Sequence, residues 1–155
     1  MLAINIVLAV VWMIATGSLH ARGLLVGLIL GYVLLGLVSL VRPIAYVRRV
    51  WAGMVLLAFA IYEVLRSNLI VAWYTVSDLR ALEPAVLRVP LEPDLTNGEL
   101  TLLSVLVTLT PGTLSIDISQ DRQSLYVHIM HVEDPDKAIR SITDGFERRI
   151  LEMRP

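Results

Sequence analysis

The sequence predicts an α-helical membrane region, formed by a helical hairpin and a long third helix, followed by a small α+β soluble domain with the element order β-α-β-β-α. Of the 155 residues, 56% are hydrophobic and 17% are charged, whereas about a quarter of the residues are charged in a typical soluble domain. The charges are also segregated, because residues 1–77 hold five basic and one acidic side chain and the rest of the chain holds eight basic and thirteen acidic ones. The stretch 107–130 alternates polar and apolar residues as a soluble β-hairpin does.

We therefore place the domain boundary near Asp78, with residues 1–78 embedded in the membrane and residues 79–155 forming the soluble domain. The chain has no cysteine, so neither a disulfide framework nor a thiolate metal site is expected. Residues 78–155 have a formal charge of −5 and no basic stripe interleaved with aromatic residues. This charge pattern excludes nucleic acid as a partner, because binding to phosphates requires a basic surface.

Three apolar segments predict helices at about residues 2–17, 22–41 and 47–77. A helix needs about 20 apolar residues to cross the hydrocarbon core of a bilayer, so the second segment is long enough, the first is short and the third is interrupted by polar residues. The sequence "TGSLHARG" between the first two segments predicts a tight helical hairpin. Gly27 and Gly31 have the spacing that lets another helix backbone approach closely, although glycine is also common in membrane helices generally.

The third segment carries a narrow polar stripe. Glu63, Arg66 and Ser67 fall on one helix face at i, i+3 and i+4. An acid and a base inside a membrane are costly and indicate either an ion path or a buried pair. We interpret Glu63 and Arg66 as a candidate intramembrane pair that has a structural or partner-contact role, and we favour this interpretation over a proton relay. The same meridian of the helix also carries Arg48, Arg49, Tyr74, Ser77 and Asp78.

Two orientations fit the positive-inside rule, which assigns arginine-rich loops to the cytoplasm. If all three segments span, the loop with Arg42, Arg48 and Arg49 lies opposite the soluble domain, which is then outside the cell. If the third segment lies in the membrane interface, these arginines and the soluble domain share the cytoplasmic side. We adopt three membrane helices, with the third tilted or partly interfacial.

In the soluble half, residues 85–92 predict a strand that ends at two prolines. Thr96 and Glu99 form a candidate capping box ahead of the apolar run "LTLLSVLVTLT", which predicts a helix closed by Pro111 and Gly112. The β-branched content of this run leaves a strand as the rival interpretation. The helix carries more apolar surface than one sheet face can cover, so we expect the residues at its end to dock on the membrane surface or on a partner. This candidate docking corner consists of Thr110, Pro111, Gly112 and Thr113.

Two alternating segments after the corner predict a hairpin, and a helix follows them. In the first strand Leu114, Ile116 and Ile118 are expected to face the core, with Ser115 and Asp117 on the opposite face. The second strand is expected to bury Leu125, Val127 and Ile129, with Tyr126 and His128 on the open face. Asp134 and Pro135 predict the start of the final helix. Its expected buried residues are Ile139, Ile142, Phe146 and Ile150.

The soluble half contains no recognisable catalytic constellation. Ser115, Asp117 and His128 resemble the parts of a hydrolase site, but there is no G-x-S-x-G motif and a solvated strand face is the favoured interpretation. His128, His131, Glu133 and Asp134 are close in sequence, yet alternation places the two histidines on opposite faces, where they cannot share a metal ion without a bulge. We therefore predict no enzymatic activity, no catalytic residue, no metal site and no cofactor.

The stretch "TLTPGTLSIDIS", followed by a short acidic turn and "LYVHIM", resembles the E subunit of the multisubunit Mrp-type cation/proton antiporters. Three further segments are similar to other parts of that family, namely "ATGSLHARGLLVGLILGY", "RSNLIVAW" and "FERRIL". The resemblance therefore covers nearly the whole chain. It implies an accessory protein of the bacterial cell membrane that does not itself translocate ions, has a cytoplasmic C-terminal domain, and belongs to a complex exchanging sodium or other monovalent cations for protons. The implied partners are the other antiporter subunits and the lipid bilayer. The alternative is a free-standing membrane-anchored binding or sensory module.

Overall fold

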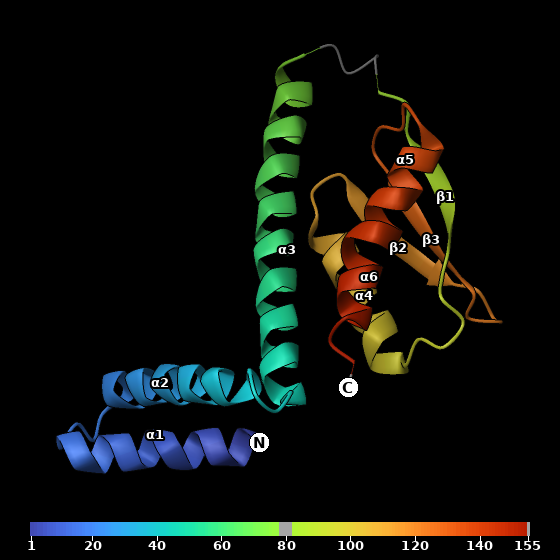
Figure 1. The fold of residues 1–155 in the computed structure, drawn as a ribbon. Helices are drawn as coiled ribbons and strands as arrows, with labels where there is room; N and C mark the ends of the chain where they lie inside the picture. The colour runs from blue at the N-terminus through green and yellow to red at the C-terminus, as the bar shows by residue number, and fades with distance from the viewer. Residues whose placement is uncertain (78–81, 155) are drawn as a thin grey trace. The chain divides into compact units, whose positions relative to one another are not determined.

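The computed structural model of the protein describes residues 1–77 and 82–154 (Figure 1). It contains several helices, two of them long and apolar enough to cross a membrane by length and composition, and a small three-stranded antiparallel sheet. These elements agree with the predicted class of a helical region plus a small α+β domain. The chain divides into two compact units, residues 1–51 and residues 52–154, which are described separately. The predicted domain boundary at Asp78 lies outside the described residues.

The first unit is built around the predicted helical hairpin. Helix α1 (Leu2–Thr16) and helix α2 (Ala21–Ser39) lie side by side and antiparallel. Gly17 ends α1 with a φ of 66°, a left-handed conformation that glycine adopts without strain. A Cβ atom on Gly27 would lie 2.8 Å from the Cα of Ala9, so this glycine allows the two backbones to touch. The glycine spacing of α2 therefore serves contact between the two helices of this chain.

Polar side chains connect the hairpin to the start of the third helix, α3 (Ala45–Val76). Asn5 is buried and its Nδ2 donates a hydrogen bond of 2.9 Å to the hydroxyl of Tyr46. The Tyr32 hydroxyl donates to the carbonyl of Val47 at 3.2 Å, and the two tyrosine rings meet edge to face. Since apolar helices in a membrane gain little from hydrophobic contact with one another, such hydrogen bonds help to fix their arrangement.

The second unit combines most of α3 with an α+β domain. Its sheet has the strand order β1-β3-β2 with both pairings antiparallel, and consists of β1 (Ala85–Pro90), β2 (Thr113–Ile118) and β3 (Ser124–Ile129). Helix α4 (Asn97–Leu109) connects β1 to β2. After β3, the chain forms α5 (Pro135–Arg140), a π-helical segment η2 (Ser141–Glu147) and α6 (Arg148–Leu151) in direct succession.

The capping signals of the sequence are present at both helix starts. The Thr96 hydroxyl oxygen accepts a hydrogen bond from the Glu99 amide, and the Glu99 carboxylate accepts one from the Thr96 amide. This is the predicted capping box of α4. The helical interpretation of this apolar run is confirmed, and the strand interpretation is wrong. Asp134 caps α5 by accepting hydrogen bonds from the amides of Asp136 and Lys137, with Pro135 in the first turn, as predicted.

The core of the second unit lies between one face of the sheet and the helices. Leu125 and Val127 of β3 are fully buried, and Ile129 packs against them, as predicted. The expected stripe of the last helix is also confirmed, since three of its four residues are buried and Ile139 is partly buried. The buried residues that form this core are Leu56, Ala60, Val89, Leu91, Leu95, Leu100, Leu103, Val107, Leu125, Val127, Ile142, Phe146 and Ile150.

The predicted inward face of β2 is wrong over its first half. Leu114 and Ile116 are 49% and 53% exposed, whereas Ser115 turns toward α4 and its hydroxyl donates to the carbonyl of Ser104 at 3.1 Å. The pairing of β2 with β3 shifts register between Ser115 and Asp117. A β-bulge inserts one residue and reverses the alternation of side chains, so only Ile118, beyond the bulge, packs against the core as expected.

Helix α3 packs along the C-terminal helix within the second unit. Its Leu56 and Ala60 belong to the buried core, and the ring of Phe59 meets Phe146 edge to face at 5.1 Å between centroids. The guanidinium of Arg149 lies 3.9 Å above the centre of the Phe59 ring, a cation–π contact. One face of α3 therefore contacts the α+β domain through these side chains.

Candidate functional site

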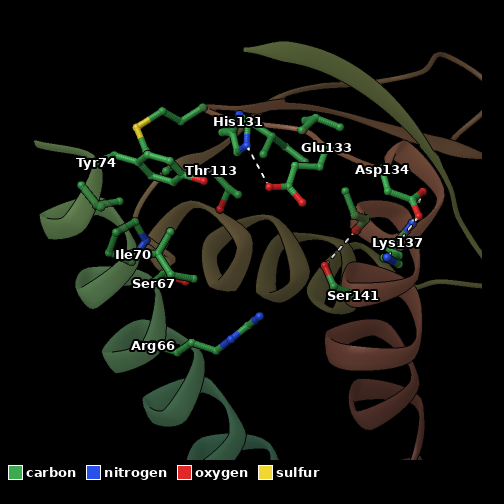
Figure 2. A pocket seen from close by; sticks show the side chains of 17 residues that line it. Arg66, Ser67, Ile70, Tyr74, Thr113, His131, Glu133, Asp134, Lys137 and Ser141 are labelled. Atoms are coloured by element: carbon green, nitrogen blue, oxygen red, sulfur yellow. Dashed lines mark hydrogen bonds and ion pairs between the residues drawn. The ribbon is translucent and has the colours of Figure 1, made fainter. Parts of the chain in front are cut away.

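An open cavity of about 380 Å³ lies within the second unit, between the C-terminal half of α3, the corner before β2, the segment after β3 and helix α5 (Figure 2). The structure brings one member of the predicted polar pair, Arg66, and three residues of the predicted docking corner to this same cavity. Its lining residues are Arg66, Ser67, Ile70, Val71, Tyr74, Pro111, Gly112, Thr113, Ile129, Met130, His131, Val132, Glu133, Asp134, Lys137, Ala138 and Ser141.

The wall formed by α3 contains the predicted pair. Arg66 Nη1 lies 3.4 Å from Glu63 Oε2, at the spacing of one helical turn. The Glu63 side chain is 16% exposed and that of Arg66 is 55% exposed, so the acid is the more enclosed member. Arg66 extends into the cavity in Figure 2. A contact of this length, with one exposed partner, neutralises charge more than it adds stability.

The docking corner is held by hydrogen bonds from its own backbone and side chains. The Thr113 hydroxyl donates to the carbonyls of Val107 at 2.5 Å and Thr110 at 2.9 Å. The Gly112 carbonyl accepts from the Met130 amide at 2.8 Å, which fastens the corner to the end of β3. These bonds make the corner a rigid element without a free nucleophile.

Gly112 is the one corner residue whose substitution by any other residue would strain the backbone. Its φ is +86°, a left-handed conformation that residues with a Cβ atom rarely adopt. A Cβ atom would nevertheless find room there, since its nearest neighbour, Val71 Cγ2, would lie 3.6 Å away. The requirement for glycine is therefore conformational, and it arises because α4 must turn sharply into β2 at this point.

The far wall of the cavity carries titratable groups that already have structural partners. His131 Nδ1 accepts a hydrogen bond from the Glu83 amide at 3.1 Å, and the His131 ring meets Tyr74 edge to face. The carboxylate of Glu133 lies 3.5 Å from His131 Nε2. The backbone amide of Lys137, together with that of Asp136, holds the pKa of the Asp134 carboxyl below its usual value. Among the described residues, no three His, Asp or Glu side chains are placed to hold a metal ion.

The hydrolase-like residues of the sequence do not meet. Ser115 bonds to α4 on the core side of the sheet, which corrects its predicted place on the open face. Asp117 accepts a hydrogen bond from the amide of Ile118 at 2.8 Å. His128 lies on β3 opposite Val86 of β1 and Leu114 of β2. Ser115 and His128 therefore point to opposite faces of the sheet and cannot share a proton.

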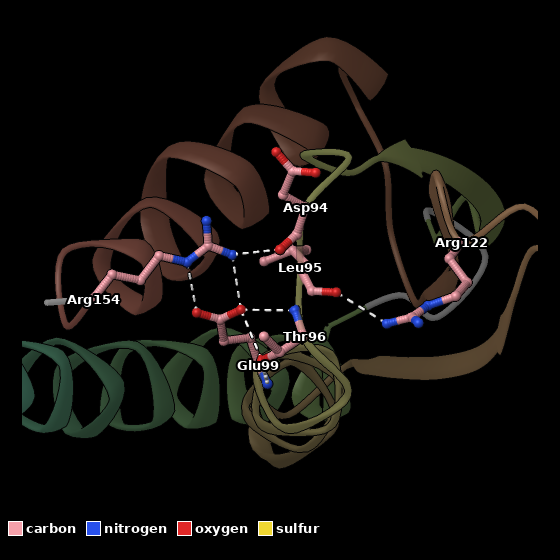
Figure 3. Close-up of polar contacts among 6 residues, drawn as sticks. All are labelled: Asp94, Leu95, Thr96, Glu99, Arg122 and Arg154. Carbon is pink, nitrogen blue, oxygen red and sulfur yellow. Dashed lines mark hydrogen bonds and ion pairs between the residues drawn. The ribbon is translucent and has the colours of Figure 1, made fainter.

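Two polar features of the second unit escaped sequence reasoning. Arg154 clamps the start of α4 through Glu99, a contact between residues 55 positions apart (Figure 3). Glu147, in the π-helical segment, is buried and accepts a hydrogen bond of 2.7 Å from the Glu92 amide. Burial raises the pKa of the Glu147 carboxyl. The capping box pointed to Glu99, but no local pattern links Arg154 or Glu147 to its partner.

Comparison with known proteins gives consistent similarities over nearly the whole chain. A family model described as "MNHE: Na+/H+ ion antiporter subunit" matches residues 5–153. The E subunit of the Na(+)/H(+) antiporter of Alkalihalophilus pseudofirmus is 37% identical over 151 residues, which cover 97% of this chain and 95% of that protein. The E subunit of the Na(+)/H(+) antiporter of Bacillus subtilis is 37% identical over 154 residues, again covering 97% of this chain and 95% of the relative.

Two solved structures contain chains similar to this one. A chain of the Mrp complex from Dietzia sp. is 25% identical with a TM-score of 0.50, and the match covers 64% of this chain and 93% of that chain. A chain of the membrane-bound sulfane sulfur reductase, an archaeal respiratory membrane complex, has a TM-score of 0.59 at 23% identity, with 99% and 98% of the two chains covered. The second similarity is one of fold.

Proposed function

Since this chain belongs to the family of Na+/H+ ion antiporter subunits, we propose that it is an accessory membrane component of a multisubunit antiporter that exchanges monovalent cations, sodium above all, for protons. Its partners are the other subunits of that complex and the lipid bilayer. The near-full-length similarity to the E subunits of two bacterial antiporters supports this proposal. So does the resemblance to a chain of an Mrp complex.

The observation that supports an accessory role is the scarcity of acids in the apolar helices. Residues 1–77 contain a single acid, Glu63, and its carboxylate faces Arg66 at 3.4 Å. Proton and cation relays through a membrane use several polar and ionisable groups in succession. A single acid that forms an ion pair with a base is better suited to balancing the charge of that base. The chain therefore supports assembly of the complex, and the ions pass through other subunits.

The membrane part comprises residues 1–78 and the cytoplasmic domain comprises residues 79–155. Helices α1 and α2 form the membrane hairpin that gives the protein its multi-pass character. Helix α2 is long enough to cross the bilayer, and α1, with 15 residues, is short for a full crossing. The segment after α2 carries Arg42, Arg48 and Arg49, whereas the hairpin turn carries only Arg22. By the positive-inside rule, the end of α2 then lies in the cytoplasm, and the domain that follows α3 shares that side when α3 stays at the interface and does not cross the bilayer.

The cavity and the docking corner are the proposed contact with a partner protein of the complex. The corner is rigid and open to the cavity, and the adjoining helix α4 exposes the apolar side chains of Val105 and Leu109. Exposed apolar side chains beside a rigid turn are suited to protein contact. Arg66 lines the same cavity, and its charge is balanced by Glu63 on the same helix.

Isolation of the complex tests the proposal. A tagged copy of the chain, purified from native membranes in a mild detergent, should bring large polytopic membrane subunits with it. Deletion of the chain should lower the amount of assembled complex and the cation/proton exchange of the membranes together. If the chain purifies alone and its deletion leaves exchange unchanged, the proposal is wrong and a free-standing membrane-anchored module is favoured.

A further inference from the structure

Within residues 52–76, helix α3 has two opposite faces. One face is built into the α+β unit, because Leu56 and Ala60 belong to its core and Ser67 is buried. The other face is exposed and mostly apolar, and its two polar side chains, Asn68 and Thr75, each donate a hydrogen bond to a backbone carbonyl of the same helix. We call it the α3 stripe and define it by Met54, Leu57, Ile61, Leu65, Leu69 and Trp73.

The α3 stripe is continuous and carries no charge. Its members follow one another at intervals of three or four residues, which places them on one side of an α-helix over a length of about 28 Å. The charged residues of this part of α3 lie elsewhere: Glu63 is largely enclosed, and Arg66 points into the cavity (Figure 2). An exposed apolar surface of this extent indicates contact with a partner or with lipid.

The opposite face decides how α3 can meet a bilayer. A helix that spans the membrane is surrounded by hydrocarbon or by other apolar helices over about 30 Å. Along α3, however, Phe59 packs against Phe146 and lies beneath the guanidinium of Arg149. These contacts hold a charged α+β domain beside the helix, and each charged side chain costs about 2.5–3.5 kcal/mol or more at the bilayer centre. Spanning by α3 is therefore incompatible with this packing.

An orientation along the membrane surface satisfies both faces. An amphipathic helix that lies in the interface buries its apolar side in the boundary between headgroups and acyl chains, while its other side stays in water. Trp73 is suited to this boundary, where tryptophan is enriched. Lipid is the favoured occupant because the same chain carries α2, which is apolar and long enough to cross a bilayer.

We propose that α3 lies along the cytoplasmic surface of the membrane with the α3 stripe in the lipid and the α+β domain on the water side. This inference rests on the membrane location given under Proposed function and specifies how the third helix is embedded. In this orientation α3 holds the docking corner at a fixed distance from the bilayer surface. A partner protein of the complex would meet the corner close to the membrane surface.

Nitroxide labels on single cysteines test this inference, and the natural absence of cysteine makes each introduced thiol unique. The stripe variants are Met54→Cys, Ile61→Cys, Leu65→Cys and Leu69→Cys in the full chain, reconstituted in lipid nanodiscs. Val33→Cys in α2 is the deep control and Gln120→Cys in the β2–β3 turn is the aqueous control. Collision rates with oxygen, which partitions into lipid, and with a water-soluble nickel chelate measure the depth of each label.

We expect all four stripe labels to lie at one shallow depth, about 5–10 Å below the headgroups. Met54 and Leu69 are about 22 Å apart along the helix axis, so a steep change of depth between them would show a spanning helix and overturn the inference. Labels open to the nickel chelate, or shielded from both reagents by protein, would overturn it as well. None of these outcomes alters the co-purification that tests the antiporter role.

Trp73 provides a second readout without a label. In the variant Trp12→Phe with Trp51→Phe it is the sole tryptophan, and bromine atoms near the headgroup end of the acyl chains should quench its fluorescence more than bromines near the chain ends. Stronger quenching by deep bromines would contradict the surface orientation.

Discussion

Arg154 and Glu99 form the best-defined ion pair of the described chain, with Nε–Oε1 and Nη2–Oε2 distances of 2.8 Å each (Figure 3). The same guanidinium donates to the carbonyl of Asp94 at 2.7 Å, and Glu99 also closes the capping box with Thr96. The C-terminal end of the unit is thereby tied to the start of α4. The side-chain hydrogen bond from Arg154 is the main reason why the pKa of Glu99 is lowered to about 2.

Glu99→Gln should lower the stability of the protein at neutral pH by about 1–3 kcal/mol, the range for a hydrogen bond to a charged group. Because the pKa of Glu99 falls from 4.5 to about 2 on folding, its contribution is complete above pH 4.5 and is lost as the pH falls toward 2. Thermal unfolding in detergent at pH 7 and at decreasing pH measures both effects. Glu152→Gln, in an exposed pair with Arg148, is the matched control and should change little. An equal effect of both variants would contradict the assignment.

Glu147 should show the opposite pH dependence. Burial raises the pKa of its carboxyl. The protonated carboxyl therefore contributes to stability in full below the unfolded pKa of 4.5, and this contribution is lost as the pH rises through the folded pKa. Glu147→Gln keeps an oxygen for the Glu92 amide and removes the buried charge. We expect the variant to be more stable at pH 8 by on the order of 1 kcal/mol, because it removes a buried charge and keeps the hydrogen bond from the Glu92 amide. The gain should vanish near pH 4 in the same unfolding measurement, and a loss at pH 8 would contradict it.

The Glu63–Arg66 pair distinguishes a structural role from a proton path. Glu63→Gln leaves the charge of Arg66 without its acid and should reduce the yield of assembled complex. The double variant Glu63→Gln with Arg66→Met should recover part of that yield, because the two effects are coupled. The measurement is the amount of complex purified from membranes, together with exchange activity per assembled complex. Normal yield with abolished exchange would instead assign Glu63 to the proton path.

Gly112→Val tests the docking corner. A β-branched residue at a φ of +86° should cost about 1–3 kcal/mol, and the displaced corner should lower the yield of complex while exchange per assembled complex stays near normal. Gly98→Ala is the control, since its Cβ would meet nothing within 4 Å and it lies in a helix, so no loss is expected. Full yield with lost exchange would show that the corner takes part in the transport cycle.

The sequence predicted the elements whose signals are local. The capping residues Thr96 and Asp134 and the alternation of β3 depend on neighbouring residues and agree with the structure. The face of Leu114 could not be predicted, because the bulge after Ser115 reverses an alternation that looks regular in sequence. The packing of Phe59 on Phe146 joins residues far apart in the chain, so the local pattern of α3 could not show that one of its faces contacts the α+β domain.

The candidate site was predictable in its parts and not in their arrangement. Spacing on one helix identified Glu63 and Arg66, and turn chemistry identified Pro111 and Gly112. That Arg66 and the corner line one cavity depends on the fold of the whole second unit. The partner of Glu99 was equally hidden, because Arg154 lies beyond α6 and is 55 residues away in sequence.

Cation-dependent proton flux into sealed vesicles tests the central claim most directly. Vesicles that contain the purified chain alone should show no flux above empty vesicles, because the apolar helices offer one acid where a relay needs several. Vesicles that contain the whole complex should show flux, and complex prepared without this chain should be recovered in lower amount. A clear flux through the isolated chain would contradict the account and make this protein an ion-translocating component.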